Sequence, residues 1–221
     1  MEQLITYGVY LHAFLGGIGL LSGMMSAVVV KGKRWHVQSG KIFSVAMMGS
    51  ALISLVIAIM PNHENLFLFL IGVFTIYMVV AGNRALSFTL RTKQQATAAD
   101  KAISGAMLIG SVAMILLGIY GMIAPLPNSV LFLFFGGFGV LLTLGDFKTF
   151  RTFSQDKQAR LKSHVGRMVG ALIASVTAFI VAGLDFKTLM AWLSPTLIGV
   201  PYMIYWTRRL ETRKGMNVNR T

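Results

Sequence analysis

Four histidines are the residues of this chain whose chemistry is most distinctive, because most of the other residues are apolar. A neutral imidazole can ligate a metal ion or haem iron, and the ring can also carry a proton near neutral pH. His12 falls inside a long apolar run, where a polar side chain without a partner is costly. His36, His63 and His164 lie near the ends of such runs. Since the chain has no cysteine, disulfides and thiolate metal sites are excluded.

The apolar runs around these histidines predict a membrane protein. Of the 221 residues, 55% are hydrophobic and 12% are charged, whereas about 25% are charged in a typical soluble domain. Residues 4–30 and 42–62 carry no charged side chain, and about 18 such residues are enough for a transmembrane helix. The net charge of +13 does not indicate nucleic-acid binding, because the basic residues flank the apolar runs. We therefore expect a lipid bilayer around the chain and no nucleic-acid partner.

Seven membrane-spanning helices are predicted, forming one all-α bundle over residues 1–207 with a short basic tail at residues 208–221. Pro195 and Pro201 interrupt the last span, so this span is either kinked or preceded by a surface segment at Phe186–Leu193. Turn-forming residues separate the spans. The predicted spans are Leu4–Val30, Lys41–Met60, Leu66–Leu90, Ile103–Ala124, Ser129–Phe147, His164–Gly183 and Leu189–Thr207.

The basic residues predict the orientation of the bundle. They cluster after the first, third, fifth and seventh spans, whereas the opposite loops hold only Lys187. By the positive-inside rule, the N-terminus lies outside and the C-terminus lies in the cytoplasm of a cell with an inner (plasma) membrane. Trp35, Trp192 and Trp206 fall at the expected interfaces, as aromatic belt residues do.

His12 is predicted to face protein and not lipid. It belongs to a stripe of small residues at helical spacings of three and four, and such stripes mark close approach between membrane helices. A single interhelical hydrogen bond from His12 is the simpler alternative to a role as a ligand. The stripe consists of Gly8, His12, Gly16, Gly19, Gly23 and Ser26.

The topology divides the histidines between the two sides of the membrane. His36, just before the second span, and His164, which opens the sixth span after Ser163 as its N-cap, lie inside; His12 and His63 lie outside. Because His12 is roughly 25–30 Å along its helix from the inner end, it cannot share one metal with the inner pair. We expect two sites, or one site and bystanders such as a solvated His63, a lipid-contacting His36 or a hydrogen-bonding His164. The candidate cofactor ligands are His12, His36 and His164.

Three charged residues lie within the predicted membrane spans or at their ends. Arg84 lies near the inner end of the third span, Asp146 ends the fifth and Arg167 lies one turn into the sixth. Intramembrane charges pair or extend toward the interface, so Asp146 is expected to pair with Arg84 or with Arg167. Such a pair either locks helices together or belongs to a proton or substrate relay.

Several short motifs resemble those of an uncharacterised family of bacterial multi-pass membrane proteins, a domain-of-unknown-function family. The resemblance covers nearly the whole chain, and it implies the same fold and location without implying an activity. It gives weight to the histidine in the first span, the one before the second and the one opening the sixth. The motifs are His12 with its glycines, Lys31 to Lys41, Asn83 to Leu86, Gly145-Asp146, His164 to Met168, Thr177 to Phe179 and Trp192 to Thr196.

Three classes of function remain open from the sequence. In the first, histidines from different helices hold haem b or a transition metal in a redox protein. In the second, a cofactor-free transporter of protons or small solutes uses Arg84, Asp146 and the histidines as a polar path. In the third, the glycine faces bind another membrane protein or a second copy of the chain. A metal hydrolase is disfavoured because no carboxylate stands at a fixed spacing from a histidine pair.

Overall fold

The computed structural model describes residues 2–91, 93–124, 126–186 and 188–218, and it is all-helical over these ranges apart from turns and one isolated bridge. Six of its helices are long and apolar enough to cross a membrane, which fits a multi-pass membrane protein. Lys187 and the last three residues of the basic tail lie outside the described residues. The helices are α1 (Glu2–Val28), α2 (Arg34–Ile57), α3 (Leu66–Ser87), α4 (Ala98–Ile123), α5 (Ser129–Thr149), α6 (Lys157–Ala178) with the π-turn Phe179–Gly183, and α7 (Leu189–Val218).

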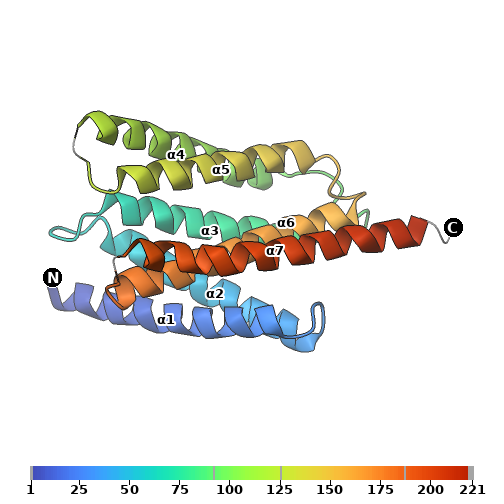
Figure 1. The fold of residues 1–221 in the computed structure, drawn as a ribbon, viewed down its shortest axis with the longest axis horizontal. Coiled ribbons are helices and arrows are strands. Elements are labelled where there is room, and N and C mark those ends of the chain that lie inside the picture. Colours follow the sequence, from blue (N-terminus) through green and yellow to red (C-terminus); the bar gives the residue numbers. More distant parts are fainter. Residues whose placement is uncertain (1, 92, 125, 187, 219–221) are drawn as a thin grey trace.

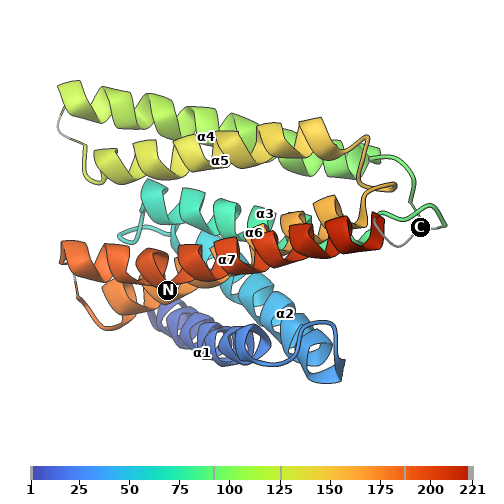
Figure 2. The same cartoon turned by 45° about the vertical axis from the view of Figure 1, so that its right-hand side comes forward.

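The helices form three groups that run roughly along the long axis of the molecule (Figure 1). The α1–α2 hairpin lies on one side, the α4–α5 hairpin lies on the other, and α3, α6 and α7 lie between them (Figures 1 and 2). Within each hairpin the two helices contact each other extensively, whereas α4 and α5 contact α3 much less. The chain alternates in direction, so α1, α3 and α5 end where α2, α4 and α6 begin. We call this end of the bundle, which carries the clusters of basic residues, the basic end.

The small-residue stripe of α1 faces α2, as predicted. A Cβ atom placed on Gly19 would lie 2.4 Å from Sδ of Met47, and one on Gly23 would lie 2.8 Å from Phe43. Side chains of α2 therefore occupy the space that the glycines leave open, which is how small residues bring membrane helices together.

Three helices begin at least five residues earlier than the predicted spans. α2 begins at Arg34, α4 at Ala98 and α6 at Lys157, because a run of apolar residues marks the membrane-buried part of a helix and not its first turn. The Asp156 carboxylate caps α6 by accepting from two backbone N–H groups, so the prediction of Ser163 as N-cap is wrong. His36 consequently lies in the first turn of α2, and His164 lies inside α6 instead of opening it.

The last helix distinguishes between the two alternatives predicted for the proline-containing span. α7 is one helix with Pro195 and Pro201 inside it, and it continues through the basic tail to Val218. The segment 189–193 is therefore the start of this helix and not a separate surface segment. α7 is not among the six helices whose composition suits a membrane crossing, but it packs along α6 over the length of the bundle (Figure 1).

We expect Gly136→Ala to destabilise the α4–α5 hairpin by about 1–3 kcal/mol, the usual range for overpacking. The added Cβ would lie 2.8 Å from the carbonyl oxygen of Ser111 and 3.0 Å from the backbone nitrogen of Ile115, and backbone atoms cannot rotate away. Gly137→Ala is the matched control, since a Cβ there meets nothing within 4 Å. The measurement is the free energy of unfolding in detergent. Equal effects at the two positions would contradict this packing.

Candidate functional site

A buried ion pair between Asp146 of α5 and Arg167 of α6 is the centre of a polar cluster inside the bundle. The two side chains are 3% and 7% exposed. The hydroxyl groups of Tyr77 on α3 and Ser104 on α4 donate to Oδ2 of Asp146 over 2.6 and 2.8 Å, while the Arg167 guanidinium donates to Oδ1. One carboxylate thus joins four helices, and its charge is balanced in a place where an unpaired charge would be very costly.

Further hydrogen bonds hold the Arg167 guanidinium, but one of its three nitrogens has no partner among the described atoms. Its guanidinium donates to Oγ of Ser163 over 2.7 Å and to the carbonyl oxygen of Leu142 over 3.2 Å. Its Nε is buried and has no hydrogen-bond partner among the described atoms. The cluster is therefore nearly but not completely satisfied.

Arg84 does not join this cluster. It donates to Asp100 over 2.7 Å, and Lys93 contacts the same carboxylate at 2.6 Å. Asp100 also closes a capping box with Thr97 at the start of α4, so α4 begins five residues before the predicted Ile103. Of the two pairings expected for Asp146, the structure has the one with Arg167, because Asp100 lies beside the end of α3 and takes the other arginine.

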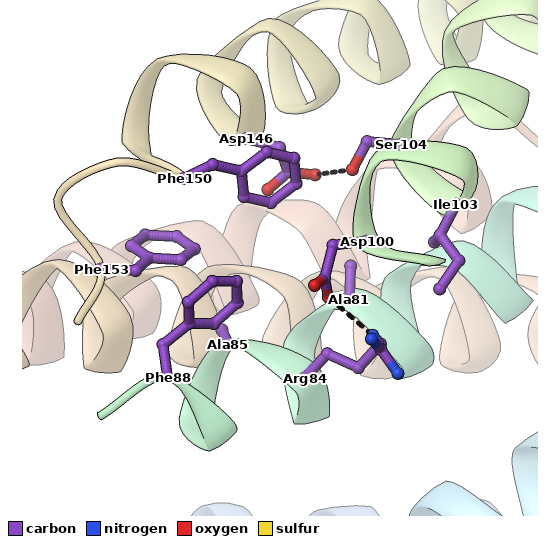
Figure 3. A pocket seen from close by; sticks show the side chains of 10 residues that line it. All are labelled: Ala81, Arg84, Ala85, Phe88, Asp100, Ile103, Ser104, Asp146, Phe150 and Phe153. Atoms are coloured by element: carbon purple, nitrogen blue, oxygen red, sulfur yellow. Dashed lines mark hydrogen bonds and ion pairs between the residues drawn. The ribbon is translucent and has the colours of Figure 1, made fainter. Parts of the chain in front are cut away.

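A small cavity separates the two carboxylates at the basic end (Figure 3). It holds about 10 Å³, which is room for about one water molecule. Phe88, Phe150 and Phe153 lie around it, and Asp100 and Asp146 approach it from α4 and α5. Pockets for small ligands usually measure about 300–1,000 Å³, so the cavity is too small for a ligand of that kind.

His12 and His36 make matching contacts at the two ends of the α1–α2 hairpin. Nδ1 of His12 lies 2.8 Å from the carbonyl oxygen of Ser50, whose hydroxyl donates back to the carbonyl of His12 over 3.0 Å. Nδ1 of His36 lies 3.0 Å from the carbonyl oxygen of Ser26, whose hydroxyl also contacts the His36 ring at 3.1 Å. Each helix therefore supplies one histidine and one serine, and His12 forms the interhelical bond that is its simpler role.

His164 makes a similar contact with a backbone carbonyl of α3. Its Nδ1 lies 2.9 Å from the carbonyl oxygen of Gly82. His36, in the first turn of α2, and His164, two turns into α6, both lie at the basic end of the bundle. His12 is far along α1 from them, with Ser50 as its partner.

The partners of Nδ1 bear on the tautomer of these rings. A carbonyl oxygen only accepts, so the bond from His164 to Gly82 requires the hydrogen on Nδ1, and Nε2 of the neutral ring then keeps its lone pair. The bond from His36 to the Ser26 carbonyl has the same requirement, whereas a bond from the Ser26 hydroxyl to the same nitrogen has the opposite one. Across the residues described, no hydrogen bond reaches either Nε2. The Nζ of Lys31 donates to the same carbonyl oxygen of Ser26 over 3.0 Å, so a lysine lies beside the contact between His36 and Ser26.

This donor set fits a two-histidine cofactor better than a closed metal site. The structure gathers no group of three or more His, Asp or Glu that could hold a metal, within the ranges it covers. Two imidazoles from different helices, oriented through Nδ1, are the usual axial ligands of a haem or part of an open metal site. His63 has a different surrounding: it is an exposed side chain whose Nε2 lies 3.5 Å from Glu2.

Comparison with protein-family models, with curated proteins and with solved structures finds no match to this chain. The resemblance to an uncharacterised membrane family therefore stays a prediction. The assignment of function rests on the geometry of the site alone.

The sequence did not reveal the partners of the site residues. Tyr77, Ser104, Ser26 and Ser50 lie in runs that look like ordinary membrane helix, and their roles depend on which helices pack together. Asp100 is different, because Thr97-Ala98-Ala99-Asp100 is a capping-box pattern that marks a helix start in sequence. That pattern would have placed the start of α4 and a second carboxylate near Arg84.

Proposed function

We propose that this chain is a redox protein of the bacterial plasma membrane that holds a haem or a transition metal between His36 and His164. The observation that carries the proposal is the pair of imidazoles at the basic end, each held through Nδ1 at a carbonyl of another helix and each with Nε2 unengaged among the described residues. His12 has a similar anchor but lacks a neighbouring histidine, so we assign it to helix packing.

We further propose seven spans, with the N-terminus outside and the basic end in the cytoplasm. The basic loops all lie at one end of the bundle, which supports this orientation by the positive-inside rule. α7 runs the length of the bundle beside α6, which supports its inclusion as a seventh span. The cofactor would then face the cytoplasmic side.

The residues of the chain would bind and orient the cofactor. The carbonyls of Ser26 and Gly82 would hold the two rings in one rotation. A bound haem or metal would supply one-electron transfer.

The test is the visible spectrum and metal content of the protein purified in mild detergent. Cells should be supplied with iron and a haem precursor during expression. We expect a Soret band with the spectrum of a two-histidine haem, or about one equivalent of a transition metal if haem is absent. A colourless and metal-free preparation would contradict the proposal.

A second function, passage of protons, is favoured by the buried cluster around Asp146. A carboxylate that is 3% exposed lies beside a cavity the size of one water at the basic end, and intramembrane charges often belong to proton paths. Proton flux into liposomes that Asp146→Asn abolishes, in a variant that remains folded, would support this function over electron transfer.

A further inference from the structure

Cations and aromatic rings gather at the basic end, where the turn between α1 and α2 meets α7. Nζ of Lys31 lies 5.1 Å from the ring centre of Trp206, and the guanidinium carbon of Arg209 lies 5.2 Å from the same ring centre. Lys33 and Arg34 follow Lys31 closely in the chain, and both are exposed. Like charges repel each other, so this arrangement favours an anion beside it. We call Lys31, Lys33, Arg34, Trp206 and Arg209 the basic seam.

No acidic side chain balances the charge of the basic seam. Within the residues that the structure describes, none of the ion pairs involves a member of the seam. The Lys31 ammonium donates to three carbonyl oxygens at the end of α1, whereas Arg209 makes one hydrogen bond, from Nη1 to the Tyr205 hydroxyl over 3.1 Å. A guanidinium carries more N–H donors than this one bond uses, and Arg209 is exposed. Arg209 can therefore donate to a further partner.

Exposed apolar side chains lie next to these cations. Val28 and Val30, just before Lys31, are 86% and 71% exposed. On α7, Ile204 and Tyr205 are exposed as well. A phospholipid has this same order of groups, with the phosphate directly above the acyl chains, whereas a free anion gains nothing from an apolar surface. Tyrosine and tryptophan are also typical of the headgroup level of a bilayer.

We propose that the basic seam binds the phosphate of an anionic phospholipid, with Lys33, Arg34 and Arg209 as its ligands. Basic sites between membrane helices bind anionic headgroups in this way, and arginine often donates to phosphate through two parallel bonds. The lipid would bridge the α1–α2 turn and α7, which pack mainly on other helices, α1 on α2 and α7 on α6. This inference goes beyond the cofactor of the proposed function and does not depend on it.

The test is a titration of phosphatidylglycerol into the purified full chain in a neutral detergent, with bound lipids counted by native mass spectrometry. We expect phosphatidylglycerol to bind more tightly than zwitterionic phosphatidylcholine. One basic residue near an anionic lipid strengthens binding about fivefold, so Lys33→Gln and Arg209→Gln should each weaken phosphatidylglycerol by about that factor. Arg151→Gln removes an exposed arginine from the same end of the bundle and is the control that should leave the affinity unchanged.

Each other outcome overturns the inference. If Arg209→Gln fails to fold, Lys33→Gln decides alone, because its side chain makes no capping hydrogen bond at the start of α2, and an unchanged affinity there refutes the site. An equal loss in Arg151→Gln would mean that the lipid responds only to the overall positive charge. If inorganic phosphate at the same concentration displaced phosphatidylglycerol, the seam would take free oxyanions and not a lipid. The lipid titration needs no cofactor, so its failure leaves the proposed function untouched.

Discussion

Asp146→Asn is expected to destabilise the protein by about 3–5 kcal/mol, the cost of leaving one member of a buried ion pair without its partner. The asparagine keeps the shape of the side chain but removes the charge that balances Arg167. It also forces the hydroxyls of Tyr77 and Ser104, which donate to the same Oδ2, to share a weaker acceptor. The measurement is the free energy of unfolding in detergent, from a reversible denaturant titration.

Two control variants test whether the loss of stability in Asp146→Asn comes from breaking the buried ion pair. Asp146→Leu with Arg167→Met removes both charges, and we expect it to be far more stable than either single variant, because apolar residues can replace a buried pair at little cost. Glu211→Gln removes the exposed partner of Lys162 and should produce no measurable change. A single variant at Asp146 that is as stable as the wild type would show that the pair does not hold the helices together.

His36→Ala and His164→Ala are each expected to weaken cofactor binding by more than about 10–100-fold. Loss of an outer-shell partner alone has an effect of that size, and removal of the ligand itself should exceed it. The two side chains contribute no hydrogen bond to the buried ion pair, so the bundle should still fold. The measurement is a Soret titration, together with metal content after purification.

The remaining histidines provide the controls. His63→Ala should bind the cofactor normally, because His63 is exposed and contacts only Glu2 among described side chains. His12→Ala should lower stability through loss of its contact with Ser50, and yet retain the spectrum. If His36→Ala and His164→Ala also retained the full spectrum, ligation by this pair would be refuted.

The sequence predicted the helices well and their contacts only in part. Apolar runs and turn residues located each helix, and the spacing of Gly16, Gly19 and Gly23 correctly predicted the face of α1 that packs on α2. Periodicity carries this information because small residues leave space on one side of a helix. The starts of α2, α4 and α6 were misplaced, since their first turns contain polar residues and extend beyond the apolar run.

The site depends on which helices are neighbours, and a single sequence does not contain that information. Asp146 had two plausible arginine partners, and the choice was decided by Asp100, whose position follows from the start of α4. The same holds for the histidines: the carbonyls that His36 and His164 contact belong to α1 and α3, and no motif around either residue identifies those partners.

The composition of α7 has a consequence for how the protein is made. The helix falls outside the six that are apolar enough to cross a membrane, and it is placed instead by its neighbours: Gly199 packs against Ile173 of α6, and the Tyr202 hydroxyl donates to the carbonyl of Ala27 on α1 over 2.7 Å. A segment of this kind is poorly recognised by the insertion machinery alone. As the seventh span that we propose, α7 would enter the bilayer during synthesis only when α6 is already present to receive it, and we expect defects in α6 to appear first as failed insertion of α7.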